Sequence, residues 1–126
     1  MSVRPESSLL QAEAERMGQL IVELLSDVDM PQNVSDDPNL AAVWLADRMI
    51  DVAKINRGRV AADAELAQNR IADISSAMGE PNSSNARRKA PEWAQIRDAQ
   101  RAADLAQVNV PVRIRGLTYT ASPRMG

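Results

Sequence analysis

The sequence contains no cysteine, no histidine and no phenylalanine, and its only aromatic residues are two tryptophans and one tyrosine. The absence of cysteine excludes disulfides and thiolate metal sites. The absence of histidine removes the usual zinc ligand, the usual general base and the usual pH switch. A site built from carboxylates alone stays open, but nearly every Asp and Glu falls where a helix would face solvent. We therefore expect no enzyme, no cofactor and no small-molecule substrate.

Long apolar runs are also missing. No stretch approaches the roughly 20 apolar residues that a membrane-spanning helix needs, so we expect no membrane association. The first residues, MSVRPESS, lack the apolar segment of a signal peptide, and we expect no secretion by that route. A chain of 126 residues with 44% apolar and 25% charged residues has the composition of one small globular domain.

The periodicity that is present is helical. Ser8 and Gln11 fit a capping box, which places a helix start near Ser7 or Ser8, and Pro31 prevents continuation. Between them, apolar residues recur at alternating spacings of four and three, which is a heptad seam. The seam consists of Leu10, Ala14, Met17, Ile21, Leu24 and Val28. We predict a first helix over about residues 7–28.

A second heptad stripe predicts a helix over residues 38–78. Asp37 can cap its start, Pro38 suits the first helical position, and Gly79 with Pro81 can end it. The stripe is interrupted only by Arg57. Its members are Val43, Ala46, Ile50, Ala53, Val60, Ala64, Ala67, Ile71, Ile74 and Met78.

Such a helix would be about 60 Å long, whereas a compact domain of this size is about 35 Å across. Either the helix breaks at residues 56–59, or it stays whole and extends into an assembly. Gly58 costs only about 1 kcal/mol inside a helix. We therefore favour one long helix, and a break or bend at Gly58 stays open.

The residues from Gly79 to Ala90 are predicted to form a polar loop containing a basic cluster, Arg87, Arg88 and Lys89. Basic clusters give non-specific affinity for nucleic acid phosphates. Here the chain is net acidic, and no aromatic platform or recognition-helix motif accompanies the cluster. We expect a solvated loop or a basic patch that binds protein, with nucleic acid as the less favoured alternative.

A third helix is predicted over residues 91–107. Pro91 marks its first turn, and its apolar face consists of Trp93, Ile96, Ala99, Ala103 and Ala106. Alanine contributes little buried area but allows close approach of a neighbouring helix. Both tryptophans, Trp44 and Trp93, are expected to anchor the core, with an interface hot spot as the alternative role for either.

The C-terminal segment changes period. From Val108 to Arg115 apolar and polar residues alternate, as in a strand, and at Gly116 the alternation reverses. A tight turn at Arg115-Gly116 would place Ile114 opposite Leu117. Alternatively, Gly116 is a bend in a single arm that lies along another subunit.

Both geometries leave an apolar face to cover. The segment can fold back on its own helices, or it can add to a neighbouring chain, and we favour the second. Seven residues are predicted to form this interface: Val110, Val112, Arg113, Ile114, Arg115, Leu117 and Tyr119. Together with Arg124, the arginines would pair with acidic groups of the neighbour.

Charge is distributed unevenly along the chain. Residues 1–80 hold 14 acidic and 7 basic residues, whereas residues 81–126 hold 3 acidic and 8 basic residues. Arginine outnumbers lysine thirteen to two, and arginine is suited to interfaces because it is weakly hydrated and forks onto carboxylates. Such a polarised chain can stack head to tail with its own copies, or present its basic end to an acidic partner.

The predicted fold class is mainly α: a helical bundle over residues 1–107 with one long helix, followed by an extended β arm or hairpin over residues 108–126. The 38–78 helix and the 108–120 arm resemble small bacteriophage virion proteins of the head-to-tail connector type. That resemblance implies rings of helical subunits that reach their neighbours with terminal arms.

We therefore expect a non-enzymatic structural subunit of an oligomeric assembly, a phage connector, neck or capsid-associated protein. Its partners would be its own copies and other structural proteins of the particle. Its location would be the virion, after assembly in the host cytoplasm. The alternative is a small helical regulator or inhibitor that binds a target protein or nucleic acid.

Overall fold

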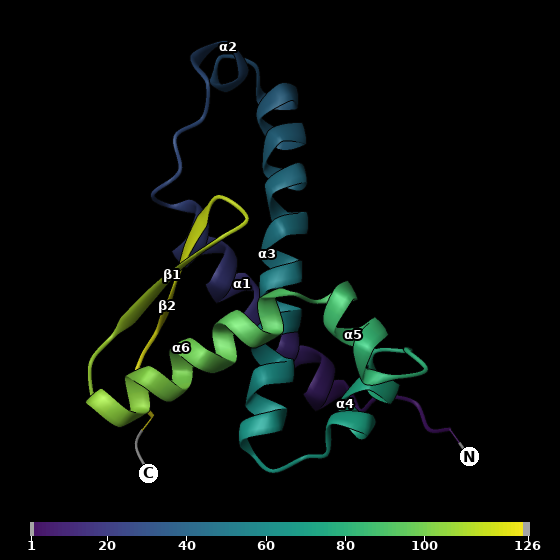
Figure 1. Ribbon diagram of the computed structural model, residues 1–126. Helices are drawn as coiled ribbons and strands as arrows, with labels where there is room; N and C mark the ends of the chain where they lie inside the picture. Colours follow the sequence, from purple (N-terminus) through teal and green to yellow (C-terminus); the bar gives the residue numbers. More distant parts are fainter. Residues whose placement is uncertain (1, 125–126) are drawn as a thin grey trace. The chain divides into compact units, whose positions relative to one another are not determined.

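The computed structural model describes residues 2–124, and within them the chain is mainly helical with a single β-hairpin, which confirms the predicted fold class (Figure 1). The elements are α1 (Ser7–Leu25), α2 (Gln32–Ser35), α3 (Pro38–Leu66), α4 (Ile71–Ala77), α5 (Ser83–Lys89), α6 (Glu92–Ala106), β1 (Val110–Ile114) and β2 (Leu117–Ala121).

The predicted helix starts are correct, and one predicted cap is not. The Oδ1 atom of Asp37 accepts hydrogen bonds from the backbone N–H groups of Asn39 at 2.8 Å and Leu40 at 3.3 Å, which satisfies the first turn of α3. At α1 the residue preceding the helix is Glu6, and it makes no side-chain cap, so the expected Ser8–Gln11 capping box does not form. α1 ends at Leu25, and the short helix α2 occupies part of the predicted loop.

The long helix predicted over 38–78 is broken, but not at Gly58. α3 runs unbroken through Gly58 and ends at Leu66, and α4 starts at Ile71. Gln68 adopts a left-handed φ of 75°, and the N–H groups of Gln68 and Asn69 bond back to the carbonyls of Glu65 and Ala64. This is a Schellman motif. The Asn69 side chain donates a second bond to the Ala64 carbonyl at 3.0 Å.

Gly58 is required for packing. A Cβ at this position would lie 2.7 Å from the Cβ of Glu92 and 3.0 Å from the backbone N of Trp93. The N-terminus of α6 therefore approaches α3 at the one place where α3 has no side chain. The cost of a helical glycine is offset by this contact.

The polar loop predicted between Gly79 and Ala90 contains a helix. The predicted left-handed cap at Gly79 is confirmed by its φ of 77°. Beyond it, the Asn82 side chain accepts a hydrogen bond from the Asn85 N–H at 2.9 Å and so caps α5. α5 was missed because it has a single buried residue, Ala86, and so no apolar period to detect.

The tight-turn geometry of the C-terminal segment is confirmed. β1 and β2 pair antiparallel, with Ile114 opposite Leu117 and Val112 opposite Tyr119. The two turn residues, Arg115 and Gly116, have φ values of 52° and 77°, as two-residue hairpin turns of the primed type require. The hairpin packs against α6 (Figure 1).

The chain divides into two compact units. Unit 1 comprises residues 2–53 and unit 2 comprises residues 54–124. This division differs from the predicted boundary at residue 107, because the hairpin belongs to the same unit as α6. Unit 1 carries 10 acidic and 3 basic residues, whereas unit 2 carries 7 acidic and 12 basic residues.

The core of unit 2 is built on α6. Its predicted apolar face is confirmed for Trp93, Ile96, Ala99 and Ala103, which are all buried, whereas Ala106 is exposed. In unit 1, α1 buries Leu20 and Leu24 and leaves the start of its predicted seam exposed. Trp44 is only half-buried and lies under the Arg48 guanidinium, 5.6 Å from the ring centre.

Candidate interaction surfaces

The predicted interface residues lie together on the hairpin, but its apolar face is already covered. Ile114, Leu117 and Tyr119 are buried, and Val110 and Val112 are half-buried. The expectation that these side chains need a neighbouring chain to cover them is wrong for the three buried ones, because α6 packs against both strands. Arg113 and Arg115 lie on the exposed side. The Arg113 Nη1 atom donates to the Thr118 Oγ1 atom at 3.0 Å.

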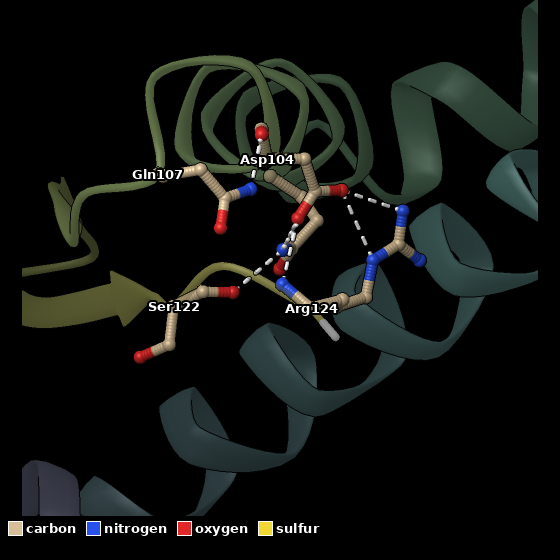
Figure 2. Close-up of polar contacts among 5 residues, drawn as sticks. Asp104, Gln107, Ser122 and Arg124 are labelled. Atoms are coloured by element: carbon tan, nitrogen blue, oxygen red, sulfur yellow. Dashed lines mark hydrogen bonds and ion pairs between the residues drawn. The ribbon is translucent and has the colours of Figure 1, made fainter. Parts of the chain in front are cut away.

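The segment that follows the hairpin is held on α6 (Figure 2). The Asp104 carboxylate accepts hydrogen bonds from the Arg124 backbone N–H at 2.9 Å and from the Arg124 guanidinium at 2.8 and 3.1 Å. The Gln100 amide donates to the Ser122 carbonyl at 2.8 Å. Arg124, expected to pair with a neighbour, thus pairs with its own chain.

This pairing affects the protonation of Asp104. The Arg124 backbone N–H and guanidinium stabilise the ionised carboxylate, and so they hold the pKa of Asp104 below its ordinary value. The Gln100 amide adds a further hydrogen bond at 3.0 Å. The last described residues are therefore attached to α6 by a charge-assisted contact.

A second polar cluster joins α3 to α6 inside unit 2. The Trp93 indole Nε1 donates to the Glu65 Oε1 atom at 2.9 Å, and Arg97 and Arg101 lie 3.5 and 3.7 Å from the same carboxylate. Asp98 and Glu65 together raise the pKa of Arg97 above its ordinary value. The Glu65 carboxylate thus has hydrogen-bond and ion-pair partners within the cluster, and we assign the cluster a structural role.

Glu92 is the most buried carboxylate, at 2% exposure. Its Oε2 atom lies 3.9 Å from the Arg115 Nη1 atom, and its Oε1 atom has no hydrogen-bond partner among residues 2–124. The contact links the start of α6 to the hairpin turn. Gly58 lies against the Cβ and backbone of Glu92.

The basic cluster lies on the last turn of α5 rather than in a loop. Arg87, Arg88 and Lys89 are exposed, and cations at a helix C-terminus interact favourably with the helix dipole. The Lys89 ammonium donates to the Met78 carbonyl at 2.9 Å and lies 3.4 Å from the Glu80 carboxylate. Part of the cluster thus fastens α5 to the end of α4.

Unit 1 exposes an apolar row on α3. The row consists of Val43, Ala46, Ile50 and Ala53, the first four positions of the predicted heptad stripe. All four are exposed, Val43 at 67% and Ile50 at 55%. We call these four residues the α3 row. On α1, Leu9, Leu10 and Val22 are exposed as well. Sequence periodicity identified this row as the first part of the heptad stripe.

Unit 2 contains a pocket between α3 and α4, with a volume of about 400 Å³. We call it the α3–α4 groove. Its lining consists of Arg57, Val60, Ala61, Ala64, Asn69, Asp73, Ile74, Ala77 and Met78. The lining is apolar apart from Arg57, Asn69 and Asp73. The groove was missed from the sequence because it exists only through the break at residues 67–70, which folds α4 back beside α3.

Metal-binding clusters and membrane-spanning helices are two further kinds of feature to consider. Among residues 2–124 no three Asp or Glu side chains cluster closely enough to hold a metal ion. None of the helices in the same range is long and apolar enough to cross a membrane.

Comparisons of the chain with protein-family models, with curated proteins and with solved structures found no match.

Proposed function

We propose that the protein is a non-enzymatic structural subunit that assembles with its own copies and with other proteins of the same particle. The observation that carries this proposal is the exposed α3 row in unit 1. Four apolar positions at heptad spacing on one helix form a seam, and seams of this kind are normally covered by another helix. Within residues 2–124 they are exposed to solvent.

The chemistry of the other surfaces supports the same reading. In unit 2, Glu65 joins α3 to α6, and Asp104 holds the segment after the hairpin on α6. The charge difference between the acidic unit 1 and the basic unit 2 favours contact between different units of different copies. For the particle we propose a phage, and for the component a connector, neck or capsid-associated protein, on the resemblance that the sequence pattern of residues 38–78 and 108–120 carries. The hairpin would contribute to such a particle through its exposed side, at Arg113 and Arg115.

The test is the mass of the full-length protein by sedimentation over a range of concentrations. We expect a multiple of the chain mass, and we expect the double variant Val43→Glu/Ile50→Glu to sediment as a monomer, because two charges at the seam would have to be buried on association. The matched control is Leu105→Glu/Val108→Glu, which places the same charges at two exposed apolar positions outside the row.

A wild-type chain that is monomeric at every concentration would contradict the proposal. It would favour the alternative of a small regulator, whose binding surface would be the basic turn of α5. In that case Arg87→Ala/Arg88→Ala should weaken nucleic acid binding at low salt, with a shallower salt dependence. Dissociation by the control variant to the same degree would show that the α3 row is not the contact.

A further inference from the structure

We infer that the α3 row of one copy packs into the α3–α4 groove of a second copy. This inference rests on the proposed function and names the surface that receives the row. The occupant is therefore a second copy of this chain, and the bound segment is the part of α3 that belongs to unit 1.

The groove has the form that receives a helix. On α3 it presents Arg57, Val60, Ala61 and Ala64, which are spaced i, i+3, i+4 and i+7 and so share one side of the helix. On α4 it presents Ile74, Ala77 and Met78. Two neighbouring helical rows of small and apolar side chains leave a trough between them, and an amphipathic helix fills such a trough with residues at the same spacing.

The α3 row matches that requirement. Its residues alternate large and small, as Val43, Ala46, Ile50 and Ala53. Facing them, the groove offers small residues, Ala61, Ala64 and Ala77, between larger ones. Large side chains placed opposite small ones allow two helices to approach closely. The row and the α3 side of the groove follow one another along the same helix.

Charge favours this pairing over contact of like units. If the α3 rows of two copies packed against each other, two copies of unit 1 would meet, each with 10 acidic and 3 basic residues. If the α3 row packs into the α3–α4 groove of a second copy, unit 1 of one copy meets unit 2 of the other, which has 7 acidic and 12 basic residues.

The first arm of the experiment alters each surface separately and measures self-association by sedimentation. Ile50→Glu alters the row, and Ala77→Glu narrows the groove and adds a charge that repels an acidic unit. We expect each to weaken self-association at least tenfold. The controls are Leu105→Glu for the first and Ala72→Glu for the second, since Ala72 is exposed on the same helix α4 outside the groove. Circular dichroism of each variant checks that it is folded.

The second arm uses the absence of cysteine from the natural chain. Ala46→Cys marks the row and Ala64→Cys marks the groove, and one of the two proteins is labelled with ¹⁵N. After mixing and mild oxidation, we expect disulfide-linked dimers to contain mainly one labelled and one unlabelled chain. Ala94→Cys, exposed on α6, is the control for random collision.

The outcomes separate this inference from the proposed function. If Ala77→Glu self-associates like the wild type, and Ala46→Cys links mainly to itself, the groove is not the receiving surface while self-assembly stands. If the wild type is monomeric and the cysteines link no faster than Ala94→Cys, both fail. A groove that instead binds a small apolar molecule while Ala77→Glu still assembles would also overturn the inference.

Discussion

Unit 1 and unit 2 differ in the exposure of their apolar side chains. Among residues 2–124, eight of the ten large apolar side chains that are exposed lie in unit 1, and fourteen of the seventeen buried apolar residues lie in unit 2. In unit 2 the hairpin packs on α6, and α4 packs on α5. Unit 1 has only two long helices and a four-residue one. Heptad spacing on a helix therefore does not by itself imply that the apolar row is buried within the chain.

The largest expected effect on folding comes from the core of unit 2. Trp93→Ala removes a buried ring and its hydrogen bond to Glu65, and we expect a loss of about 3–5 kcal/mol in the free energy of unfolding. Trp44→Ala in unit 1 removes a half-buried ring, and we expect a loss of about 1–2 kcal/mol. Urea denaturation followed by circular dichroism measures both. Equal losses would contradict the difference in packing between the units.

The two tryptophans also allow each unit to be observed by itself. Trp44→Phe leaves tryptophan fluorescence only from Trp93 in unit 2, and Trp93→Phe leaves it only from Trp44 in unit 1. At concentrations where the chain is monomeric, we expect the Trp44 signal to change at a lower urea concentration, because less apolar surface is buried around it. Coincident transitions would indicate a single cooperative unit.

The next largest effect on the free energy of unfolding is expected at Gly58, one of two glycines that lie within helices. Gly58→Ala would place a Cβ against the backbone of α6, and we expect a net loss of about 1–2 kcal/mol although alanine favours the helix. Gly18→Ala on α1 is the matched control. No atom lies within 4 Å of a Cβ at Gly18, so we expect a gain of about 0.5–1 kcal/mol. Thermal or urea unfolding of the two variants would contradict the role of Gly58 if both changes had the same sign.

The sequence predicted the parts of the fold that depend on local signals. The Asp37-Pro38 start, the left-handed Gly79 and the pairing of Ile114 with Leu117 each follow from a residue type at a defined position. The break after α3 could not be found in this way, because the left-handed residue is a glutamine, Gln68. The more obvious breaker, Gly58, serves packing instead, and packing partners far along the chain leave no local signal.

The interaction surfaces were predictable only in part. The heptad stripe through Val43 and Ile50 is visible in the sequence, but its exposure depends on which other elements fold over it. The C-terminal strands were read correctly as strands, yet their apolar face was assigned to a neighbour. α6 covers that face, and the alanines of α6 give a weak hydrophobic pattern from which this packing could not be predicted.

The smallest expected effect concerns the attachment of the last described residues to α6. Because Arg124 holds the pKa of Asp104 below its ordinary 3.8, the contact contributes to stability above the unfolded pKa. That contribution is lost as the pH falls through the lower, folded value. We expect the Arg124 amide resonance, followed by NMR, to shift with a midpoint below that of a free aspartate, and the hairpin resonances to stay in place. The contact is partly exposed, so raised salt should weaken it and the change in global stability should be small.

Two variants decide whether Asp104 is responsible for that shift. Asp104→Asn keeps an acceptor for the Arg124 N–H but removes the charge, and the acid-dependent movement of the Arg124 resonance should disappear. Asp98→Asn is the control, since Asp98 is also on α6 but pairs with Arg97. If the Arg124 resonance still titrates in Asp104→Asn, another carboxylate holds the segment. If it titrates in neither variant, the loss cannot be assigned to Asp104, because α6 has then been altered by either change.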